Sequence, residues 1–474
     1  MNNIKIGLEV HIGLNKEIKT KMFCSCKLPT NPEPNTNCCP TCLGQPGAKP
    51  VFNKAVLKAA LKLAVALNCN IAKEAIFSRK TYFYPDMPSN YQITQYEFPI
   101  GEGGNLELSP GKKIALRRIH MEEDPASLIH PGGVSDAPFT LIDYNRAGTP
   151  LMEVVTEPDI ESPEEARIFL KKLLTIVEYL GIYDNATGTM KADANVSVKE
   201  TGYTRVEVKN ISGFKEIESA LNYEIIRQRQ AANNGERIFQ ETRGWDADKQ
   251  ATYPMRTKED ENDYGYISEP NLPKIEITDE MISKARKEIP ELAHVKSTRF
   301  RDTYHLNAED AEVLTADMEL GDLFERVAKE IEPLLAAKWL RKELAGILNE
   351  SKKSLKDITL DEKQLISLLK MFEKKKINDR TARELLEKLI IKRFDVEKHV
   401  KEQNLEAVSY SNELEKFCKE AILENPKVLD DFKAGKQESL NFLVGQVMKK
   451  TKGKASAGDC KAIIEKLVKQ SETA

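Results

Sequence analysis

Five of the eight cysteines in this chain of 474 residues lie between Cys24 and Cys42. A CxC pair, Cys24 and Cys26, is followed by a CxxC pair, Cys39 and Cys42. We expect these four to be the ligands and Cys38 to be the spare, with the choice between Cys38 and Cys39 left open by the sequence. Four thiolates at such spacing suit a tetrahedral zinc ion. Because no position is left open for water, the predicted site is structural and staples a loop. Buried free cysteines are the alternative.

Acidic residues and histidines recur on the polar faces of several predicted strands. Strict alternation in residues 4 to 14 places Glu9 and His11 on one side of a strand. The same alternation groups further polar residues: Arg118, His120, Glu122 and Asp124, with Glu123 on the opposite face; Glu153 on another strand; and Asp193 with Asn195. Carboxylates with an occasional imidazole suit a magnesium site for nucleotide phosphates. For any single residue, a solvated surface strand is the alternative.

Motifs of several other site classes are absent from the sequence. No GxxxxGK[ST] loop occurs, which disfavours P-loop nucleotide chemistry, and the GEGG run at 101–104 is typical of a turn. No GxSxG motif occurs, so Ser/His/Asp catalysis has no support, and the HExxH motif of zinc proteases is absent as well.

Strands and helices of the first 290 residues must position these groups. Besides 4–14, we expect strands at 113–123, 150–157, 191–198 and 204–211. We expect helices from Asn53 to about Leu67, from Ser162 to Gly181 and at roughly 216–234. This alternation predicts an α+β class, with a mixed-sheet cradle domain at 1–290 that carries the cysteine loop.

From about residue 291, glycine and proline become rarer and apolar residues recur at helical spacing. The sequence predicts an all-α helical domain at 291–408 and a small all-α tail domain at 409–474. Residues 433–474 contain nine lysines and four acidic residues, so the tail is cationic.

The composition describes a soluble globular protein that works in the cytoplasm. The chain has 71 Lys and Arg against 74 Asp and Glu, which argues against a uniformly basic nucleic-acid coat. No run of eighteen apolar residues and no signal-peptide core occur, so we expect no membrane association.

Many segments resemble the GatB family, which is the B subunit of tRNA-dependent amidotransferase. They are IGLEVH at 6–11, KTYFYPDMPSNYQITQ at 80–95, RIHMEEDPA at 118–126, DYNRAGTPLMEVVTEPDI at 143–160, KADANVS at 191–197, KN at 209–210 and FLVGQVMKKTKGKA at 442–455. The chain lacks the large inserted domain expected of the archaeal paralogue that serves only tRNA(Gln), which favours GatB proper.

The resemblance implies an ATP-dependent carbon–nitrogen ligase that converts Asp-tRNA(Asn) or Glu-tRNA(Gln) to Asn-tRNA(Asn) or Gln-tRNA(Gln), with glutamine as amido donor. In that enzyme a glutaminase subunit supplies ammonia through a channel, and a small third subunit wraps the other two. The GatB chain binds the mischarged tRNA, phosphorylates the side-chain carboxylate with ATP and Mg²⁺, and lets ammonia displace the phosphate. The preference between the two tRNAs stays open.

The resemblance also assigns site residues. Magnesium is expected at His11, Glu122 or Glu123, and Glu153, with Glu9 and Asp193 as nearby acids that bind metal or steer ammonium. Contacts with phosphate or carboxylate are expected from Arg118, Lys191 and Lys209. Contacts with tRNA phosphates are expected from Lys449, Lys450, Lys452 and Lys454, for which a solvated lysine face is the alternative.

Two other functions stay open at this point. One is a noncatalytic zinc-containing tRNA-binding protein whose acidic strands are surface. The other is an ATP-dependent ligase that amidates a free small acid and has no need of a cationic tail.

Overall fold

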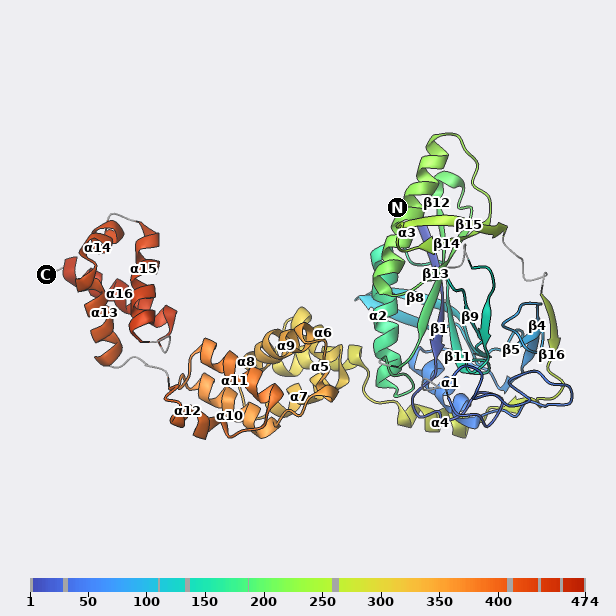
Figure 1. Cartoon of the computed structure of the whole chain (residues 1–474), viewed down its shortest axis with the longest axis horizontal. Helices are drawn as coiled ribbons and strands as arrows, with labels where there is room; N and C mark the ends of the chain where they lie inside the picture. Colours follow the sequence, from blue (N-terminus) through green and yellow to red (C-terminus); the bar gives the residue numbers. More distant parts are fainter. Residues whose placement is uncertain are drawn as a thin grey trace. The chain divides into compact units, whose positions relative to one another are not determined.

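The computed structural model describes residues 3–28, 33–109, 111–132, 137–185, 187–257, 264–406, 412–433, 436–451 and 455–472. Contacts within the chain divide it into two compact units, Met1–Leu292 and Ala293–Ala474 (Figure 1). Each unit is described by itself below.

The first unit is built on a ten-stranded mixed sheet. In the order in which they pair, its strands are β15 (Ala251–Thr257), β14 (Glu241–Asp246), β13 (Val206–Ile211), β12 (Met190–Val198), β1 (Ile4–Gly13), β11 (Pro150–Thr156), β8 (Lys112–Glu123), β6 (Gly101–Glu102) and β2 (Asn70–Ile71), with β7 (Asn105–Ser109) beside β8. Only β13 and β14 pair in parallel, and α3 (Phe214–Asn233) connects them. In this order β1, the first strand of the chain, lies at the centre of the sheet between β12 and β11.

Helices cover one face of this sheet (Figure 1). α1 (Lys54–Ala66) begins after Asn53, whose side chain accepts a hydrogen bond from a backbone N–H of the first turn. α2 (Pro163–Tyr179) begins after Ser162, which caps the helix in the same way. Both helices were predicted, and both predictions are confirmed. α2 packs against α3, and α3 contacts β12 and β13.

The alternation in β1 separates a dry side from a polar side. Ile6, Leu8, Val10 and Ile12 are at most 1% exposed, so every second side chain of the strand belongs to the core. Successive side chains point to opposite faces of a sheet. The intervening residues of β1 therefore project from the other face, where the polar groups of its neighbours also gather.

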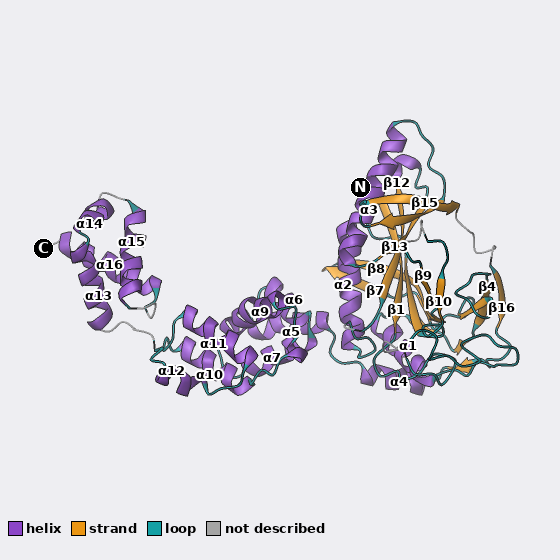
Figure 2. Cartoon of the chain, viewed as in Figure 1, coloured by secondary structure: helices purple, strands orange, loops and turns teal. Residues whose placement is uncertain are grey.

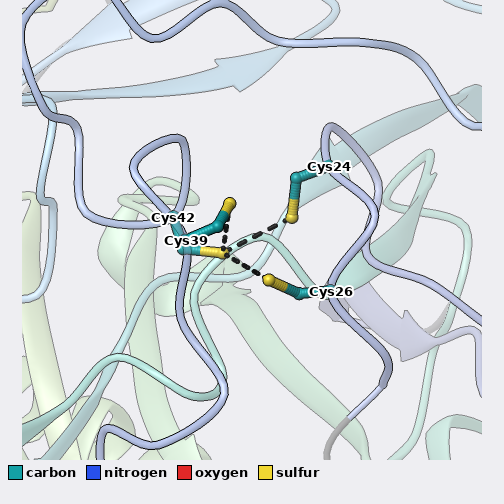
Figure 3. Close-up of side chains that lie close together, drawn as sticks. All are labelled: Cys24, Cys26, Cys39 and Cys42. Atoms are coloured by element: carbon teal, nitrogen blue, oxygen red, sulfur yellow. Dashed lines mark hydrogen bonds between the residues drawn. The ribbon is translucent and has the colours of Figure 1, made fainter.

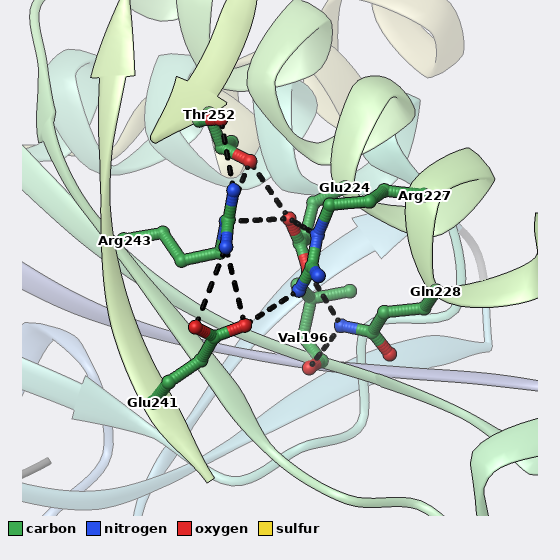
Figure 4. Close-up of polar contacts among 7 residues, drawn as sticks. All are labelled: Val196, Glu224, Arg227, Gln228, Glu241, Arg243 and Thr252. Atoms are coloured by element: carbon green, nitrogen blue, oxygen red, sulfur yellow. Dashed lines mark hydrogen bonds and ion pairs between the residues drawn. The ribbon is translucent and has the colours of Figure 1, made fainter. Parts of the chain in front are cut away.

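A buried network of charged side chains joins α3 to β14 and β15 (Figure 4). Glu224, which is fully buried, accepts hydrogen bonds from Arg227 at 2.7 and 2.9 Å and from Thr252 at 3.0 Å. Glu241 accepts from Arg227 at 2.9 Å and from Arg243 at 3.3 Å. Removing one partner of such a buried pair generally costs about 3–5 kcal/mol. The network therefore fixes this edge of the sheet to its helix.

Smaller sheets border the large one. β16 (Gly265–Ser268), β4 (Ser78–Thr81) and β5 (Tyr91–Thr94) form a three-stranded sheet. The two-stranded pairs are β10 (Leu141–Asp143) with β9 (Ser127–Ile129), and β17 (Ile275–Glu276) with β3 (Glu74–Ala75). A 3₁₀ turn spans Lys199–Thr201, and α4 (Asp279–Glu288) packs on α1.

The second unit is helical throughout its described part (Figure 2). Its first group comprises α5 (Ala293–Tyr304), α6 (Ala308–Thr315), α7 (Met318–Val327), α8 (Pro333–Lys338), a π-helix (Trp339–Leu344), α9 (Ala345–Glu350), a 3₁₀ turn (Leu355–Asp357), α10 (Glu362–Glu373), α11 (Asp379–Ile391) and α12 (Val396–Glu402). Its second group comprises α13 (Asn412–Glu424), α14 (Pro426–Lys433), α15 (Gln437–Lys450) and α16 (Ala457–Glu472). Each group has a core of its own.

The predicted fold class, a mixed-sheet α+β part followed by helical parts, is confirmed. The predicted boundary after residue 290 falls close to the division between the two units. The boundary between 408 and 409 stays a prediction, because residues 407–411 lie outside the described part of the chain. None of the described helices is long and apolar enough to cross a membrane.

Candidate functional site

One row of side chains crosses four strands on the polar face of the sheet. His11 of β1 lies opposite Lys191 of β12 on one side and opposite Glu153 of β11 on the other. Glu153 in turn lies opposite His120 of β8. Since side chains in register across a sheet project from the same face, strand order brings together residues more than a hundred positions apart.

Three of these side chains form a group that can hold a metal ion. One ligand atom each from His11, Glu122 and Glu153 lies within 4.8 Å of the others. The Nε2 atom of His11 is 3.4 Å from a carboxylate oxygen of Glu122 and 3.3 Å from one of Glu153. The structure thus brings together three residues that were predicted to bind magnesium.

His120 completes the group, and the sequence analysis gave it no role. Its Nε2 atom is 3.4 Å from Glu153 and 3.7 Å from Glu122, and the residue is 2% exposed. Its buried Nδ1 atom has no hydrogen-bond partner among the described residues. The alternation that grouped His120 with Glu122 was the available signal, but it could not reveal the contact with Glu153 on another strand.

Charge balance couples the imidazoles to the carboxylates. Burial acts to lower the pKa of His11, but the hydrogen bond and negative charge of Glu153, with the charge of Glu122, raise it to about 10. Burial acts to raise the pKa of Glu153, but His120 and His11 hold it well below its ordinary value. At neutral pH, His11 is therefore protonated, and its charge offsets the buried carboxylates. A divalent cation at this place would take over that role.

A second acidic group lies one row along the same face. Glu9 is opposite Asp193 of β12, and Lys209 of β13 donates a hydrogen bond of 2.8 Å to Asp193. Lys209 is also 3.4 Å from Glu207. Burial, followed by the charge of Glu153, raises the pKa of Glu9. Burial acts to lower the pKa of Lys209, but the charges of Asp193 and Glu207 raise it. A cation and several carboxylates thus share this end of the site.

The predicted basic residues Arg118 and Lys191 flank these groups. Arg118 lies on β8 two residues before His120, and its buried Nε atom has no hydrogen-bond partner among the described residues. Desolvation and the charge of Arg146 lower the pKa of Lys191. Arg146 itself donates hydrogen bonds from its Nε and Nη2 atoms to the two carboxylate oxygens of Asp124. Because the Nε atom of Arg118 has no partner among the described residues, it can donate a hydrogen bond to a bound anion.

Glu123 is not part of the metal-binding group. Its carboxylate accepts a hydrogen bond of 2.9 Å from the backbone N–H of Ile93 in β5, and its backbone carbonyl accepts one of 2.7 Å from Gln92. Burial raises the pKa of Glu123 to about 8. Of the two alternatives predicted for the acidic position on β8, Glu122 faces His11 and Glu123 anchors a neighbouring strand.

Four cysteines form the second group that can hold a metal ion (Figure 3). The Sγ atom of Cys42 is 3.4 Å from that of Cys24, 3.6 Å from that of Cys39 and 3.7 Å from that of Cys26. Cys38 lies apart, with its thiol 3.6 Å from Oδ1 of Asn145. The group contains the four cysteines that we expected as ligands, with Cys39 rather than Cys38.

Lys21 is a buried cation that the sequence analysis missed. It is fully buried, and its Nζ atom lies 3.3 Å from the Sγ atom of Cys42 and 3.2 Å from the backbone oxygen of Asn37. The hydrogen bond from Cys24 and the charge of Lys21 lower the pKa of the Cys42 thiol. A buried ammonium needs a compensating negative charge, and a thiolate at Cys42 provides one.

The cysteine loop is tied to the loop that follows β10. Lys21 also lies 3.4 Å from the backbone oxygen of Tyr144, and the side chain of Asn145 accepts a hydrogen bond of 2.7 Å from Asn37. Asn35 donates to Ile142 at 2.9 Å. The loop after β10 carries Arg146, the partner of Asp124, so the cysteine loop supports a segment at the rim of the acidic groups.

The predicted tRNA-binding lysines are described only in part. Lys449 is exposed, whereas Lys450 pairs with Glu424 at 2.6 Å and with Glu420 at 3.4 Å. Lys452 and Lys454 lie outside the described residues.

Family models match most of the chain. Residues 4–283 match the GatB/GatE catalytic domain, and residues 322–468 match the GatB domain. The chain belongs to the GatB family. The resemblance seen in the sequence motifs is thereby confirmed, and both groups of candidate ligands lie within the catalytic-domain match.

Curated relatives match along nearly their whole length. The Carboxydothermus hydrogenoformans protein is 43% identical over 95% of this chain and 95% of its own length. The Clostridium beijerinckii protein is 43% identical over 97% and 98%, and the Thermotoga petrophila protein is 42% identical over 98% and 98%. All three are named as the B subunit of aspartyl/glutamyl-tRNA(Asn/Gln) amidotransferase. The predicted class, one component of a tRNA-dependent amidotransferase and carbon–nitrogen ligase, is confirmed at the level of the family.

We expect Cys39→Ser to abolish retention of zinc by the four-cysteine group and Cys38→Ser to preserve it. Of these two cysteines, Cys39 lies with the other three thiols. Elemental analysis of the purified protein should find about one ion per chain in the wild type and in Cys38→Ser. Equal retention in the two variants, or loss in Cys38→Ser alone, would contradict this assignment.

Proposed function

We propose that this GatB-family chain activates the side-chain carboxylate of an amino acid esterified to tRNA and transfers ammonia to it. The substrates are Asp-tRNA(Asn), Glu-tRNA(Gln) or both. The observation that carries the proposal is the convergence of His11, Glu122 and Glu153 on one face of the sheet, with Arg118 and Lys191 beside them. Buried groups that shift one another's pKa values cluster at functional sites. The buried Nε atom of Arg118 has no hydrogen-bond partner among the described residues, so it can donate to a bound anion.

The chemistry explains why acids and bases are mixed here. A carboxylate is a poor electrophile, so it must first be converted to an acyl phosphate, from which phosphate can leave. The terminal phosphoryl group of ATP moves to that oxygen, ADP departs, and ammonia then forms the carbon–nitrogen bond as phosphate leaves. Arg118 and Lys191 would bind the phosphate or carboxylate oxygens, because positioning and charge stabilisation supply most of phosphoryl-transfer catalysis.

The donor set suits a hard divalent cation. Glu122 and Glu153 offer carboxylate oxygens and His11 offers one imidazole nitrogen, which fits Mg²⁺ and also Mn²⁺. Bound there, the ion would neutralise triphosphate charge during transfer. Glu9 and Asp193, one row away, steer ammonium toward the site, while Lys209 offsets part of their charge. Glu123 serves as an anchor for β5 in this account.

The four-cysteine group is proposed to hold a structural zinc ion. Four sulfur ligands leave no open position, so the ion staples the loop and takes no part in the reaction. A tetrathiolate zinc site carries net negative charge, and Lys21 would offset part of it. This accounts for a buried lysine whose described contacts include no carboxylate.

The remaining assignments follow from the family. We propose a cytoplasmic enzyme in which a glutaminase subunit supplies the ammonia and a small third subunit contacts both larger chains. The relatives' shared name includes both Asp- and Glu-charged tRNA, so both substrates belong in the assays.

Replacing His11 with Ala should lower tRNA-dependent ATP hydrolysis and amidation by at least about 100-fold, since even outer groups of a metal site contribute 10- to 100-fold. Arg118→Gln should also lower the rate. Arg117→Gln is the matched control, because Arg117 is largely exposed and pairs with Glu157 at 3.0 Å. The assay uses the co-expressed three-subunit enzyme with Asp-tRNA(Asn) and Glu-tRNA(Gln), and tRNA affinity is measured alongside.

If His11→Ala still binds tRNA but no longer hydrolyses ATP, the result supports the proposal. Unchanged ATP hydrolysis in His11→Ala would instead favour the noncatalytic tRNA-binding alternative. Amidation of free aspartate or glutamate without tRNA would favour the ligase that acts on a small acid.

The cationic tail is proposed to bind tRNA phosphates. Replacing Lys449, Lys450, Lys452 and Lys454 with Gln should weaken tRNA binding. The slope of log affinity against log salt concentration should become shallower by up to about four, because each phosphate contact releases about one counterion. Glutaminase activity should stay unchanged. Lys450 offers an internal control, since it is already paired with two acids, so Lys449→Gln should weaken binding more than Lys450→Gln. Equal tRNA affinity in all these variants would rule the role out.

A further inference from the structure

Lys21 lies between the four-cysteine group and the loop after β10, residues 144–149. Its side chain is fully buried, and its Nζ atom is 3.3 Å from the Sγ atom of Cys42 and 3.4 Å from the backbone oxygen of Tyr144. A third contact is the backbone oxygen of Asn37, at 3.2 Å. The ammonium of Lys21 therefore joins two segments that are 123 positions apart in the sequence.

The stem of Lys21 and the next residue contact the same loop. Gly148 has a φ angle of +82°, and a Cβ atom there would lie 3.7 Å from the aliphatic stem of Lys21. The backbone N–H of Met22 donates a hydrogen bond of 2.8 Å to the backbone oxygen of Gly148. Lys21 and Met22 thus hold the loop after β10 at two points, Tyr144 and Gly148.

The loop after β10 is in turn hydrogen-bonded to the end of β8. The backbone N–H of Gly148 donates to the oxygen of Asp124 at 2.9 Å, and the N–H of Asp124 donates to the oxygen of Thr149 at 2.8 Å. The guanidinium group of Arg146 donates to both carboxylate oxygens of Asp124. The loop and the residue after β8 therefore move as one piece.

Two strands with candidate metal ligands end or begin at this place. Glu122 lies on β8, two residues before Asp124. β11 begins at Pro150, directly after the loop, and carries Glu153. A displacement of the loop would therefore shift the ends of both strands and change the separation of the two carboxylates.

The charge of Lys21 also affects the four-cysteine group. A zinc ion with four thiolates carries about two negative charges, and a buried net charge is costly unless a group of opposite sign lies close by. The ammonium of Lys21 is such a group, because it touches Cys42. Groups that contact the ligands of a metal site typically contribute about 10- to 100-fold to its affinity.

We propose that Lys21 is a positioning residue that couples the four-cysteine group to the loop after β10 and, through that loop, to the strands that carry Glu122 and Glu153. The ammonium that zinc-bound thiolates attract is the one that holds the backbone oxygen of Tyr144. Such coupling is reciprocal, so zinc stabilises the loop by as much as the loop, through Lys21, stabilises zinc. This inference rests on the proposed zinc site and on the proposed function.

The test measures backbone hydrogen exchange and zinc affinity in the three-subunit enzyme. Removing zinc from the wild type with a chelator should speed exchange in residues 144–149 by about 10-fold and leave exchange in β14 unchanged. Lys21→Met keeps an unbranched side chain but lacks the charge and the donors. It should lose about 10- to 100-fold in zinc affinity, and its residues 144–149 should exchange faster than those of the wild type even with zinc bound.

Two further variants separate coupling from general destabilisation. Lys21→Arg keeps the charge and should retain zinc better than Lys21→Met, whereas a side chain that only fills space would show the reverse order. Lys62→Met is the matched control. Lys62 is also buried, but its ammonium lies 3.8 Å from Glu17 and 3.6 Å from Glu288 instead of a thiol. This variant should keep wild-type zinc affinity and wild-type exchange in residues 144–149.

Equal zinc affinity in Lys21→Met and Lys62→Met would overturn the coupling. Unchanged exchange in residues 144–149 after removal of zinc from the wild type would overturn it too, and this measurement decides alone if Lys21→Met does not fold. A wild type that retains no metal would overturn the zinc site and this inference together. Failure of the proposed function would look different, because His11→Ala would leave ATP hydrolysis intact while exchange still responded to zinc.

Discussion

The candidate site depends on the positive charge that compensates two buried carboxylates. Glu122 and Glu153 lie on neighbouring strands, and both contact the imidazoles of His11 and His120 at 3.3 to 3.7 Å. Removing ionised carboxylates from water costs several kcal/mol each unless positive charge lies close by. The strands hold the two carboxylates close together although their negative charges repel each other. A divalent cation can bind between them because it supplies the positive charge that they need.

The surrounding elements serve this requirement in different ways. The central strand β1 places His11 between β12 and β11, and the apolar residues on its other face anchor it in the core. The buried network around Glu224 fixes the edge of the sheet, and the cysteine loop supports the segment that carries Arg146. The network holds the outer strands β14 and β15 to α3, and the cysteine loop holds the loop after β10 that carries the partner of Asp124.

The fold class and most residues of the candidate site could be predicted from the sequence. The contacts that could not be predicted depend on the tertiary structure. Alternation identified Glu9, His11 and Glu122 as polar-face residues because the period of a strand is local. The contact of His120 with Glu153 could not be read, because it depends on strand order, and β11, which pairs with β8, follows it in the chain only after β9 and β10. Lys21 gave no local signal, since its partners come from the folded cysteine loop. Tyr82 and Tyr96 gave no local signal either, because their ring contacts with Tyr264 and Tyr266 are made only in the folded chain.

Diffraction from crystals of the three-subunit enzyme soaked in Mn²⁺, recorded at the manganese absorption edge, would test the central claim most directly. The account predicts an anomalous peak about 2.0–2.4 Å from the ligand atoms of His11, Glu122 and Glu153, which is a usual range for metal–oxygen and metal–nitrogen bonds. A peak confined to Glu9 and Asp193, or none on this face of the sheet, would contradict it.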